Sequence, residues 1–330
     1  MKKLPVKKGF TTGTAAAAAA KAALIYMLRG EKLKRVSITL PLTTIDIDVH
    51  FENATPFVIK YSGDDPDITN NAKIYAELAL TDGSGEIFIT GGRGIGIVTK
   101  KGLQVPVGSY AINPAPQKII RDNLVDILPK DKSILVKIGI VDGEMLAKKT
   151  FNSRLGIIGG LSILGTTGII TPMSLAAIKS TIEAQINVLL AEGTQYFYLV
   201  PGKIGENFIQ HIFADAKTIV VSNYFDYAIT YLLTLGITNF AIGGHPGKLT
   251  KIAMGYYNTH SKVSPQANRY IANKFKLRNS FNTVEEIINS GIDVNLIARD
   301  ISERILKDYG INVPVYLCNM KGTLIGSYEP

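Results

Sequence analysis

Apolar and polar residues follow two different patterns along this chain of 330 residues. In the N-terminal part, an alanine-rich run after Thr14 predicts a helix that Thr14 caps and Gly30 ends. Residues 35–51 then alternate with a period of two, which predicts two strands. We therefore expect a mixed α+β domain over residues 1–150.

From residue 151 onward, apolar strands and amphipathic helices alternate. The apolar residues between 175 and 189 recur every three or four positions, which places them on one face of a helix. Strands are predicted at residues 196–200, 218–222 and 239–242, with helices between them. This order indicates a three-layer αβα domain over residues 151–330 with a largely parallel sheet.

Ligands of such sheets bind beyond the carboxyl ends of the strands, where loops meet helix N-termini. In this chain the loops in question are residues 201–205, 222–225 and 243–248. We expect the first of them, which contains Pro201, Gly202 and Gly205, to contribute to a ligand site.

The charge balance restricts the class of partner. Lysine and arginine total 36 against 27 acidic residues, a net charge of +9. The basic residues form no run of five and tryptophan is absent, so neither a nucleic-acid patch nor a stacking platform is indicated. A small substrate with several carboxylates, an anionic surface and a basic surface without a specific partner all fit the charge.

Two features indicate the cellular compartment. Lys21 interrupts the apolar stretch 15–28, and no apolar run reaches the ~18 to 20 residues that span a bilayer. The single cysteine, Cys318, has no partner for a disulfide within the chain, as is usual in a reducing compartment. We expect a cytoplasmic protein.

Three glycine-rich segments are candidate binding elements. Residues 9–14 precede a helix, where backbone amides and the hydroxyls of Thr11, Thr12 and Thr14 suit an anion, although a cap and a turn would use the same residues. In residues 155–168, glycines permit close approach to a flat ligand or close packing in the core. Residues 89–99 continue as a strand and open no helix, so a Rossmann loop is rejected, and a substrate loop or a flexible turn remains.

Titratable residues occur in three further loops. His245 and Lys248 lie at a predicted helix start, which suits a carboxylate or a proton transfer, and His260 is a second histidine candidate. The acidic group of Asp64, Asp65 and Asp67 lacks the spacing of a calcium loop. Zinc signatures are absent from the sequence, and we expect no protein-bound metal.

Several long motifs resemble those of one family. They are GFTTGT, SGDDPDIT, ITGGRGIGIVTKKGL with VPVGSYAINPAP, KKTFNSRLGIIGGLSILGTTGI, GGHPGKL and NTHS. In this order, between residues 9 and 261, they resemble the CbiD family of cobalt-precorrin-5B C1-methyltransferases. The resemblance implies two domains and methyl transfer from S-adenosylmethionine to C1 of cobalt-precorrin-5B, giving cobalt-precorrin-6A in anaerobic cobalamin synthesis. The substrate is then an anionic tetrapyrrole that carries its own cobalt.

The chain departs from the family pattern at three positions. Ala15 stands where a cysteine often follows TTGT, so a cysteine nucleophile is not expected. Arg93 replaces a residue that is often acidic and Lys101 one that is often proline, which weakens a catalytic role for the loop at Gly91.

Together with the resemblance, these features assign roles. Asp65 and His245 are the catalytic candidates. The substrate-binding candidates are Thr11, Thr12, Thr14, Asp64, Asp67, Lys248 and His260. The cofactor-binding candidates are Gly165, Thr166, Thr167, Gly168, Pro201, Gly202 and Gly205. The alternative is a tetrapyrrole carrier without enzymatic activity; a homo-oligomer is compatible with either function.

Overall fold

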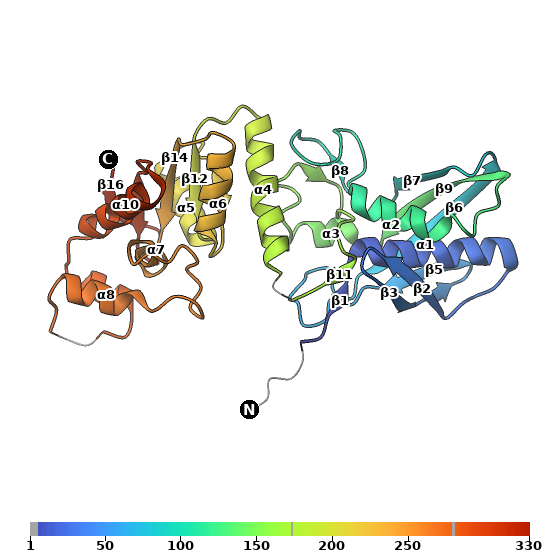
Figure 1. Cartoon of the computed structure of the whole chain (residues 1–330), viewed down its shortest axis with the longest axis horizontal. Coiled ribbons are helices and arrows are strands. Elements are labelled where there is room, and N and C mark those ends of the chain that lie inside the picture. Colours follow the sequence, from blue (N-terminus) through green and yellow to red (C-terminus); the bar gives the residue numbers. More distant parts are fainter. Residues whose placement is uncertain (1–5, 173, 279–280) are drawn as a thin grey trace. The chain divides into compact units, whose positions relative to one another are not determined.

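The computed structural model describes residues 6–172, 174–278 and 281–330, and the chain divides into two compact units (Figure 1). The first unit ends at Leu175 and the second begins at Ala176, whereas the sequence pattern changes at residue 151. Residues 151–172 belong to the first unit because two short strands return to it. β11 (Ile169–Ile170) pairs with β1 (Gly9–Phe10), and β10 (Ile157–Ile158) pairs with β8 (Ile97–Val98), both antiparallel.

The first unit contains a five-stranded sheet in the order β4-β5-β6-β9-β7 and a separate hairpin, β2-β3. The remaining strands are β2 (Arg35–Leu40), β3 (Thr43–Asp48), β4 (His50–Glu52), β5 (Thr55–Ile59), β6 (Lys73–Asp82), β7 (Ile87–Gly91) and β9 (Lys132–Ile140). The helices are α1 (Thr12–Arg29), α2 (Pro114–Leu124) and α3 (Gly143–Ala147). Helix α1 packs against α2 and the sheet (Figure 1).

Helix α1 is held against the sheet by its small side chains. The run from Ala15 to Ala20 is completely buried, and it shares one core with Val58, Ile74 and Ile138 of the sheet. The helix begins three residues earlier than the sequence indicated, because its N-cap is Thr11, whose hydroxyl accepts a hydrogen bond from the amide of Thr14. Gly30 ends the helix in a left-handed conformation, as predicted.

The second unit contains a sheet in the order β13-β12-β14-β15-β16, in which only the pairing of β16 with β15 is antiparallel. The strands are β12 (Phe197–Val200), β13 (Thr218–Val220), β14 (Phe240–Gly244), β15 (Val315–Cys318) and β16 (Leu324–Tyr328). The helices are α4 (Leu175–Ala191), α5 (Lys203–Ile212), α6 (Phe225–Thr234), α7 (Pro246–Ala253), α8 (Ala267–Lys274), α9 (Val284–Asn289) and α10 (Asn295–Tyr309).

Helices cover both faces of this sheet. Phe208 and Ile209 of α5 form one buried cluster with Val200, while residues of α4, α6, α7 and α10 form a larger cluster on the other face. The chain moves from β12 to β13 in one direction across the sheet, and from β13 through β14 to β15 in the other. Because the crossovers between parallel strands are right-handed, α5, which connects β12 to β13, lies on one face and the later helices lie on the other. The predicted fold classes, α+β and α/β, are confirmed. In the described part of the chain, no helix combines the length and apolarity needed to cross a membrane.

Candidate functional site

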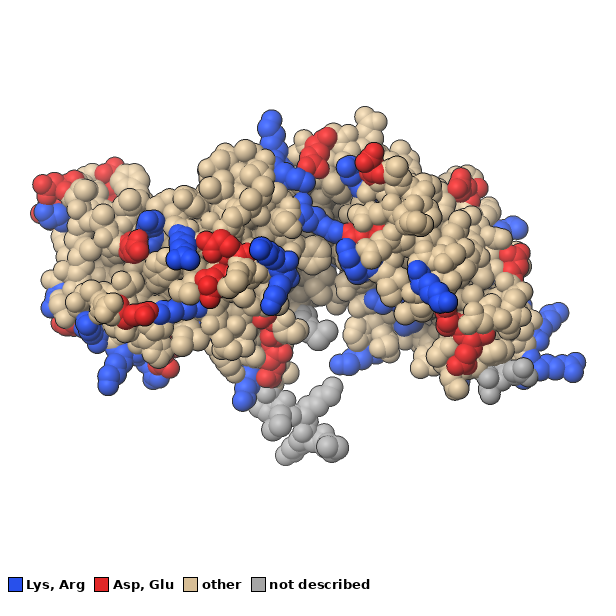
Figure 2. All heavy atoms as spheres, turned by 180° about the vertical axis from the view of Figure 1, so that it is seen from behind, with Lys and Arg blue, Asp and Glu red and all other residues tan. Residues whose placement is uncertain are grey.

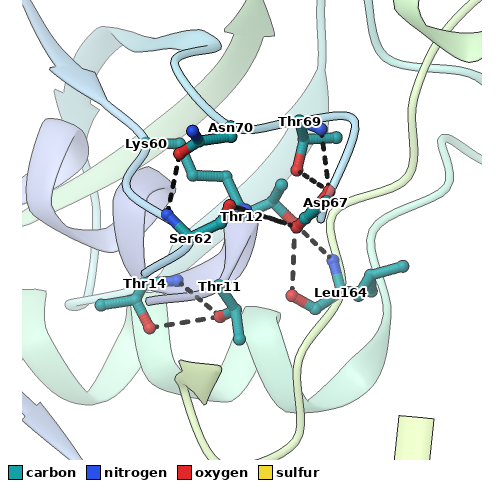
Figure 3. A network of polar contacts seen from close by, with 9 residues as sticks. All are labelled: Thr11, Thr12, Thr14, Lys60, Ser62, Asp67, Thr69, Asn70 and Leu164. Carbon is teal, nitrogen blue, oxygen red and sulfur yellow. Dashed lines mark hydrogen bonds and ion pairs between the residues drawn. The ribbon is translucent and has the colours of Figure 1, made fainter. Parts of the chain in front are cut away.

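The three threonines of the GFTTGT motif bind a neighbouring glycine loop (Figure 3). The hydroxyl of Thr12 accepts the amide of Leu164 at 2.9 Å and donates to its carbonyl at 3.2 Å. The hydroxyl of Thr14 donates to the carbonyl of Gly168 at 2.7 Å, and the amide of Thr11 donates to the same carbonyl at 2.9 Å. We call Thr11, Thr12 and Thr14 the threonine clasp.

Most of the hydroxyls and amides of residues 11–14 that were predicted to bind a ligand already have hydrogen-bond partners within the protein. All three threonines are buried, and the amides of Gly13 and Thr14 at the helix start already have partners, the carbonyl of Leu164 and the hydroxyl of Thr11. The side chains of Thr166 and Thr167, in contrast, are exposed. The clasp therefore positions the 164–168 loop, and the loop is the part open to a ligand.

Gly165 and Gly168 are explained by the same packing. A Cβ atom on Gly165 would lie 2.4 Å from the Cβ of Thr11, and the φ angle of this residue is +124°. A Cβ on Gly168 would lie 2.8 Å from the hydroxyl of Thr14. The sequence pattern predicted these glycines and the threonines in different domains, but both groups lie in the first unit.

Replacing Thr12 tests the clasp. In Thr12→Val the amide of Leu164 loses its acceptor in a partly buried setting, which costs about 1 kcal/mol of unfolding free energy. Thr12→Ser keeps the hydroxyl and should retain most of the stability. Urea unfolding of both variants measures the difference, and equal stabilities would show that these hydrogen bonds do not hold the loop.

A buried ion pair organises the acidic loop beside the clasp. Lys60 is only 1% exposed, and its ammonium donates to Asp67 at 2.6 Å and to Ser62 at 2.7 Å (Figure 3). The other carboxylate oxygen of Asp67 accepts the amide and the hydroxyl of Thr69. Burial by itself would raise the pKa of Asp67, but the Lys60 and Thr69 interactions outweigh it and lower this pKa.

The three acids of this loop therefore have different environments. Asp67 is engaged by Lys60 and Thr69, and Asp64 accepts the amide of Lys7 at 2.8 Å. Asp65 is partly exposed, and its charge acts on Lys60. Lys60 was not predicted as a site residue, although Val58, Lys60 and Ser62 share the inward phase of an alternating pattern and are all buried.

In the second unit, the strand order reverses between β12 and β14, and sheets of this kind bind ligands beyond the carboxyl ends of the strands at such a reversal. Helix α5 starts there after Gly202 without a side-chain cap, and a Cβ on Gly202 would meet no atom within 4 Å. Gly205 is packed instead, since its Cβ would lie 2.9 Å from the carbonyl of Gly243 and 3.1 Å from Pro201. The amides at the start of α5 suit an anionic ligand. We call the loops 201–205 and 245–248 the switch-point crevice.

Both ring nitrogens of His245 are engaged. The amide of Gly247 donates to Nδ1 at 3.0 Å, so His245 caps α7. The proton therefore resides on Nε2, which contacts Glu285 at 2.8 Å. This arrangement fixes the ring and leaves no nitrogen open for a proton transfer to a ligand.

Lys248 is the cation of the switch-point crevice. It is half-buried, and among the residues that the structure describes no carboxylate pairs with it. Burial, together with the charge of Lys251, lowers its pKa. Lys251 is buried and donates to the carbonyl of Thr259 at 2.9 Å, which connects α7 to the turn that holds His260. The ring of His260 accepts the amide of Lys262 in that turn.

The remaining charged side chains are mixed in sign on the face of the molecule that Figure 2 shows, where lysine and arginine are interspersed with acidic residues. Within the described residues, no group of three histidine, cysteine or acidic side chains could hold a metal ion.

The fold and these loops define a two-unit α+β and α/β protein whose glycine- and threonine-rich segments surround candidate sites for small ligands. The CbiD family model matches residues 1–172. The cobalt-precorrin-5B C(1)-methyltransferase of Methanocaldococcus jannaschii is 41% identical, over 98% of this chain and 96% of that protein. The protein of the same name from Moorella thermoacetica is 40% identical, over 81% and 74%. The chain belongs to the CbiD family, which confirms the resemblance of the motifs.

A solved structure gives a weaker likeness. The cobalamin biosynthesis protein (cbiD) from Archaeoglobus fulgidus is 27% identical, with a TM-score of 0.44, and the match covers 78% of this chain and 83% of that one.

Proposed function

We propose that this chain transfers a methyl group from S-adenosylmethionine to C1 of cobalt-precorrin-5B, giving cobalt-precorrin-6A in cobalamin synthesis. The observation that carries the proposal is the 41% identity, over 98% of the chain, to a relative named for this methyl transfer. The relatives are named as enzymes, which favours methyl transfer over the alternative of a tetrapyrrole carrier.

The described residues fit such a reaction. The methyl donor supplies an activated methyl group, and the acceptor is a carbon of the substrate, so the protein needs no nucleophile of its own. What it supplies is binding, orientation and exclusion of water. The single cysteine, Cys318, is completely buried, and burial raises its pKa to about 12, so it has no role as a thiolate.

Two places offer binding groups. The threonine clasp holds the 164–168 loop with the side chains of Thr166 and Thr167 exposed, and the hydroxyl of Thr167 donates to the carbonyl of Ile169. The switch-point crevice offers the first amides of α5, the open position at Gly202 and the cation of Lys248. The crevice suits a carboxylate, a group that the methyl donor carries once and the substrate several times.

Removal of Lys248 is expected to weaken binding of the carboxylate-bearing ligand. Lys248→Met should raise the KM for that ligand about tenfold, because a charge-assisted hydrogen bond is lost. Lys307→Met makes the same change of net charge at an exposed position of α10 and should leave KM unchanged. The difference between the two variants should also shrink as salt is added. Equal KM values for the two variants would remove Lys248 from the site.

The activity itself is tested by incubating the protein with cobalt-precorrin-5B and methyl-labelled S-adenosylmethionine. Mass spectrometry of the corrinoid should show the gain of one labelled methyl group. A corrinoid of unchanged mass, bound to the protein with saturable affinity, would instead indicate the carrier.

A further inference from the structure

The first unit contains a cavity of about 460 Å³ at the open edge of β7, apart from the threonine clasp and the acidic loop. Its walls come from β7 and from the chain that leads into α2. The lining residues are Ile89, Thr90, Gln104, Val105, Pro106, Gly108, Ser109, Tyr110, Ile112, Pro114 and Gln117. The size is within the range of small-ligand sites.

The edge strand presents backbone groups to this cavity. β7 pairs with β9 in parallel, and the ladder begins with Ile134 donating to the carbonyl of Glu86 and ends with Gly92 donating to Ile138. In a parallel ladder alternate residues bond to the partner strand, so the even-numbered residues of β7 face β9. The N–H and C=O of Ile89 therefore point away from β9, toward the open edge of the sheet, and Ile89 is one of the residues that line the cavity.

The backbone groups of Ile87, the preceding odd-numbered residue of β7, also point away from β9. There the guanidinium of Arg121 donates to the carbonyl of Ile87 at 3.4 Å. No hydrogen bond from another described residue is made to the outward N–H or C=O of Ile89. A donor and an acceptor thus remain side by side for a ligand.

The chemistry of the lining selects the ligand. It contains no lysine, arginine, histidine or acidic residue, so phosphates and carboxylates are not matched there. Val105, Pro106, Ile112 and Pro114 supply apolar surface, while Thr90 and Ser109 supply hydroxyls. Such a cavity suits an uncharged planar ring that carries adjacent donor and acceptor groups and has hydroxyls attached.

The wall opposite β7 is firmly placed. The ring of Tyr110 packs on Gly91, where a Cβ would lie 2.4 Å from the ring. Next to it, the amide of Ala111 donates to the carbonyl of Gly96 at 2.7 Å. Gln117 is fixed as well, since its side-chain amide donates to the carbonyl of Ile112 at 2.8 Å. The cavity is therefore formed before a ligand arrives.

We infer that this cavity binds the adenine ring and ribose of an adenosyl ligand, with the ring edge on the outward backbone groups of β7. The inference rests on the proposed function, which requires S-adenosylmethionine, and it names the part of the chain that holds the nucleoside end. It departs from the sequence-based assignment of the cofactor to residues 165–168 and 201–205. The charged end of the same ligand finds no counterpart in this lining.

Two proline variants of the edge strand test the inference. Proline at an outward position removes an N–H that makes no bond in the ladder with β9, and both variants also lose an isoleucine side chain that packs on the core. Ile89→Pro removes the N–H at the cavity, and Ile87→Pro is the matched control outside it. Isothermal titration of the full chain with 5′-methylthioadenosine, an uncharged adenosyl thioether, should show affinity about tenfold lower for Ile89→Pro and nearly unchanged for Ile87→Pro.

A second variant covers the case in which Ile89→Pro does not fold. Ser109→Phe fills the cavity from an exposed position and should abolish binding of 5′-methylthioadenosine. Equal affinities of wild type, Ile89→Pro and Ser109→Phe would overturn the inference, as would tighter binding of ATP than of adenosine. If the wild type methylates its substrate while these variants bind like wild type, the inference fails and the proposed function stands. If the wild type binds 5′-methylthioadenosine with the expected variant pattern but forms no methylated product, the proposed function fails and the nucleoside cavity stands.

Discussion

Gly94→Ala is expected to destabilise the protein by about 3–5 kcal/mol, because no relaxation of a flexible side chain can make room for the new methyl group. The φ angle of Gly94 is +78°, and a Cβ there would lie 2.0 Å from the carbonyl oxygen of Ile140. Gly143 and Gly160 both pack against Gly94, since a Cβ on either of them would lie within 2.4 Å of the Gly94 backbone. Three segments of the first unit thus meet backbone to backbone at glycines.

Gly85→Ala is the matched control for this effect. Its φ angle is +87°, but a Cβ there would meet nothing within 4 Å, so only the conformational cost of about 1 kcal/mol is expected. Urea unfolding measures both free energies. Equal losses of unfolding free energy in the two variants would show that the contact between Gly94, Gly143 and Gly160 can relax to accept a methyl group.

Lys60→Met is expected to cost about 3 kcal/mol, because it removes the partner of a partly buried carboxylate. Asp67 then keeps its bonds from Thr69 and the 3.5 Å hydrogen bond from the hydroxyl of Ser62. Lys132→Met breaks a lysine–aspartate pair of the same 2.6 Å length to Asp82, but that pair is solvent-exposed, and little change is expected. Thermal unfolding at pH 7 compares the variants. If Lys60→Met and Lys132→Met lose similar stability, burial does not strengthen the ion pair of Lys60.

The same ion pair gives a pH dependence of defined sign. The folded-state pKa of Asp67 lies below the ordinary value of 3.8, so folding favours its ionised form. The stabilisation is therefore present above pH 3.8 and is lost as the pH falls through the folded-state pKa. Unfolding measured across this range should show wild type losing its advantage over Asp67→Asn on acidification. A constant difference would mean that Asp67 does not titrate with folding.

The elements that sequence patterns predicted well have long periodic signals. The alanine run and the alternation over residues 35–51 predicted one helix and two strands, and the structure has α1 and the strands β2 and β3, with a third, short strand, β4, at the end of the range. The return of residues 157–170 to the first unit was not predicted, because β10 and β11 have two residues each and no period can be read from two residues.

The candidate site was only partly predictable, because its contacts join residues that lie far apart in the sequence. The glycines and threonines of the first unit were identified as a group of interest, but sequence does not state that Thr12 contacts Leu164, 152 positions away. His245 carried a clearer signal. Pro246 follows it at the first helical position, which makes His245 the residue before a helix start and therefore a cap.

Carbon-13 nuclear magnetic resonance of the corrinoid, formed by the purified chain from cobalt-precorrin-5B and S-adenosylmethionine labelled in its methyl group, decides whether the protein is the C1-methyltransferase. The proposed function predicts one enriched methyl resonance that couples to ring carbon C1, and no enrichment elsewhere. A label on another ring carbon, or a corrinoid without label under conditions in which it binds the protein, would contradict it.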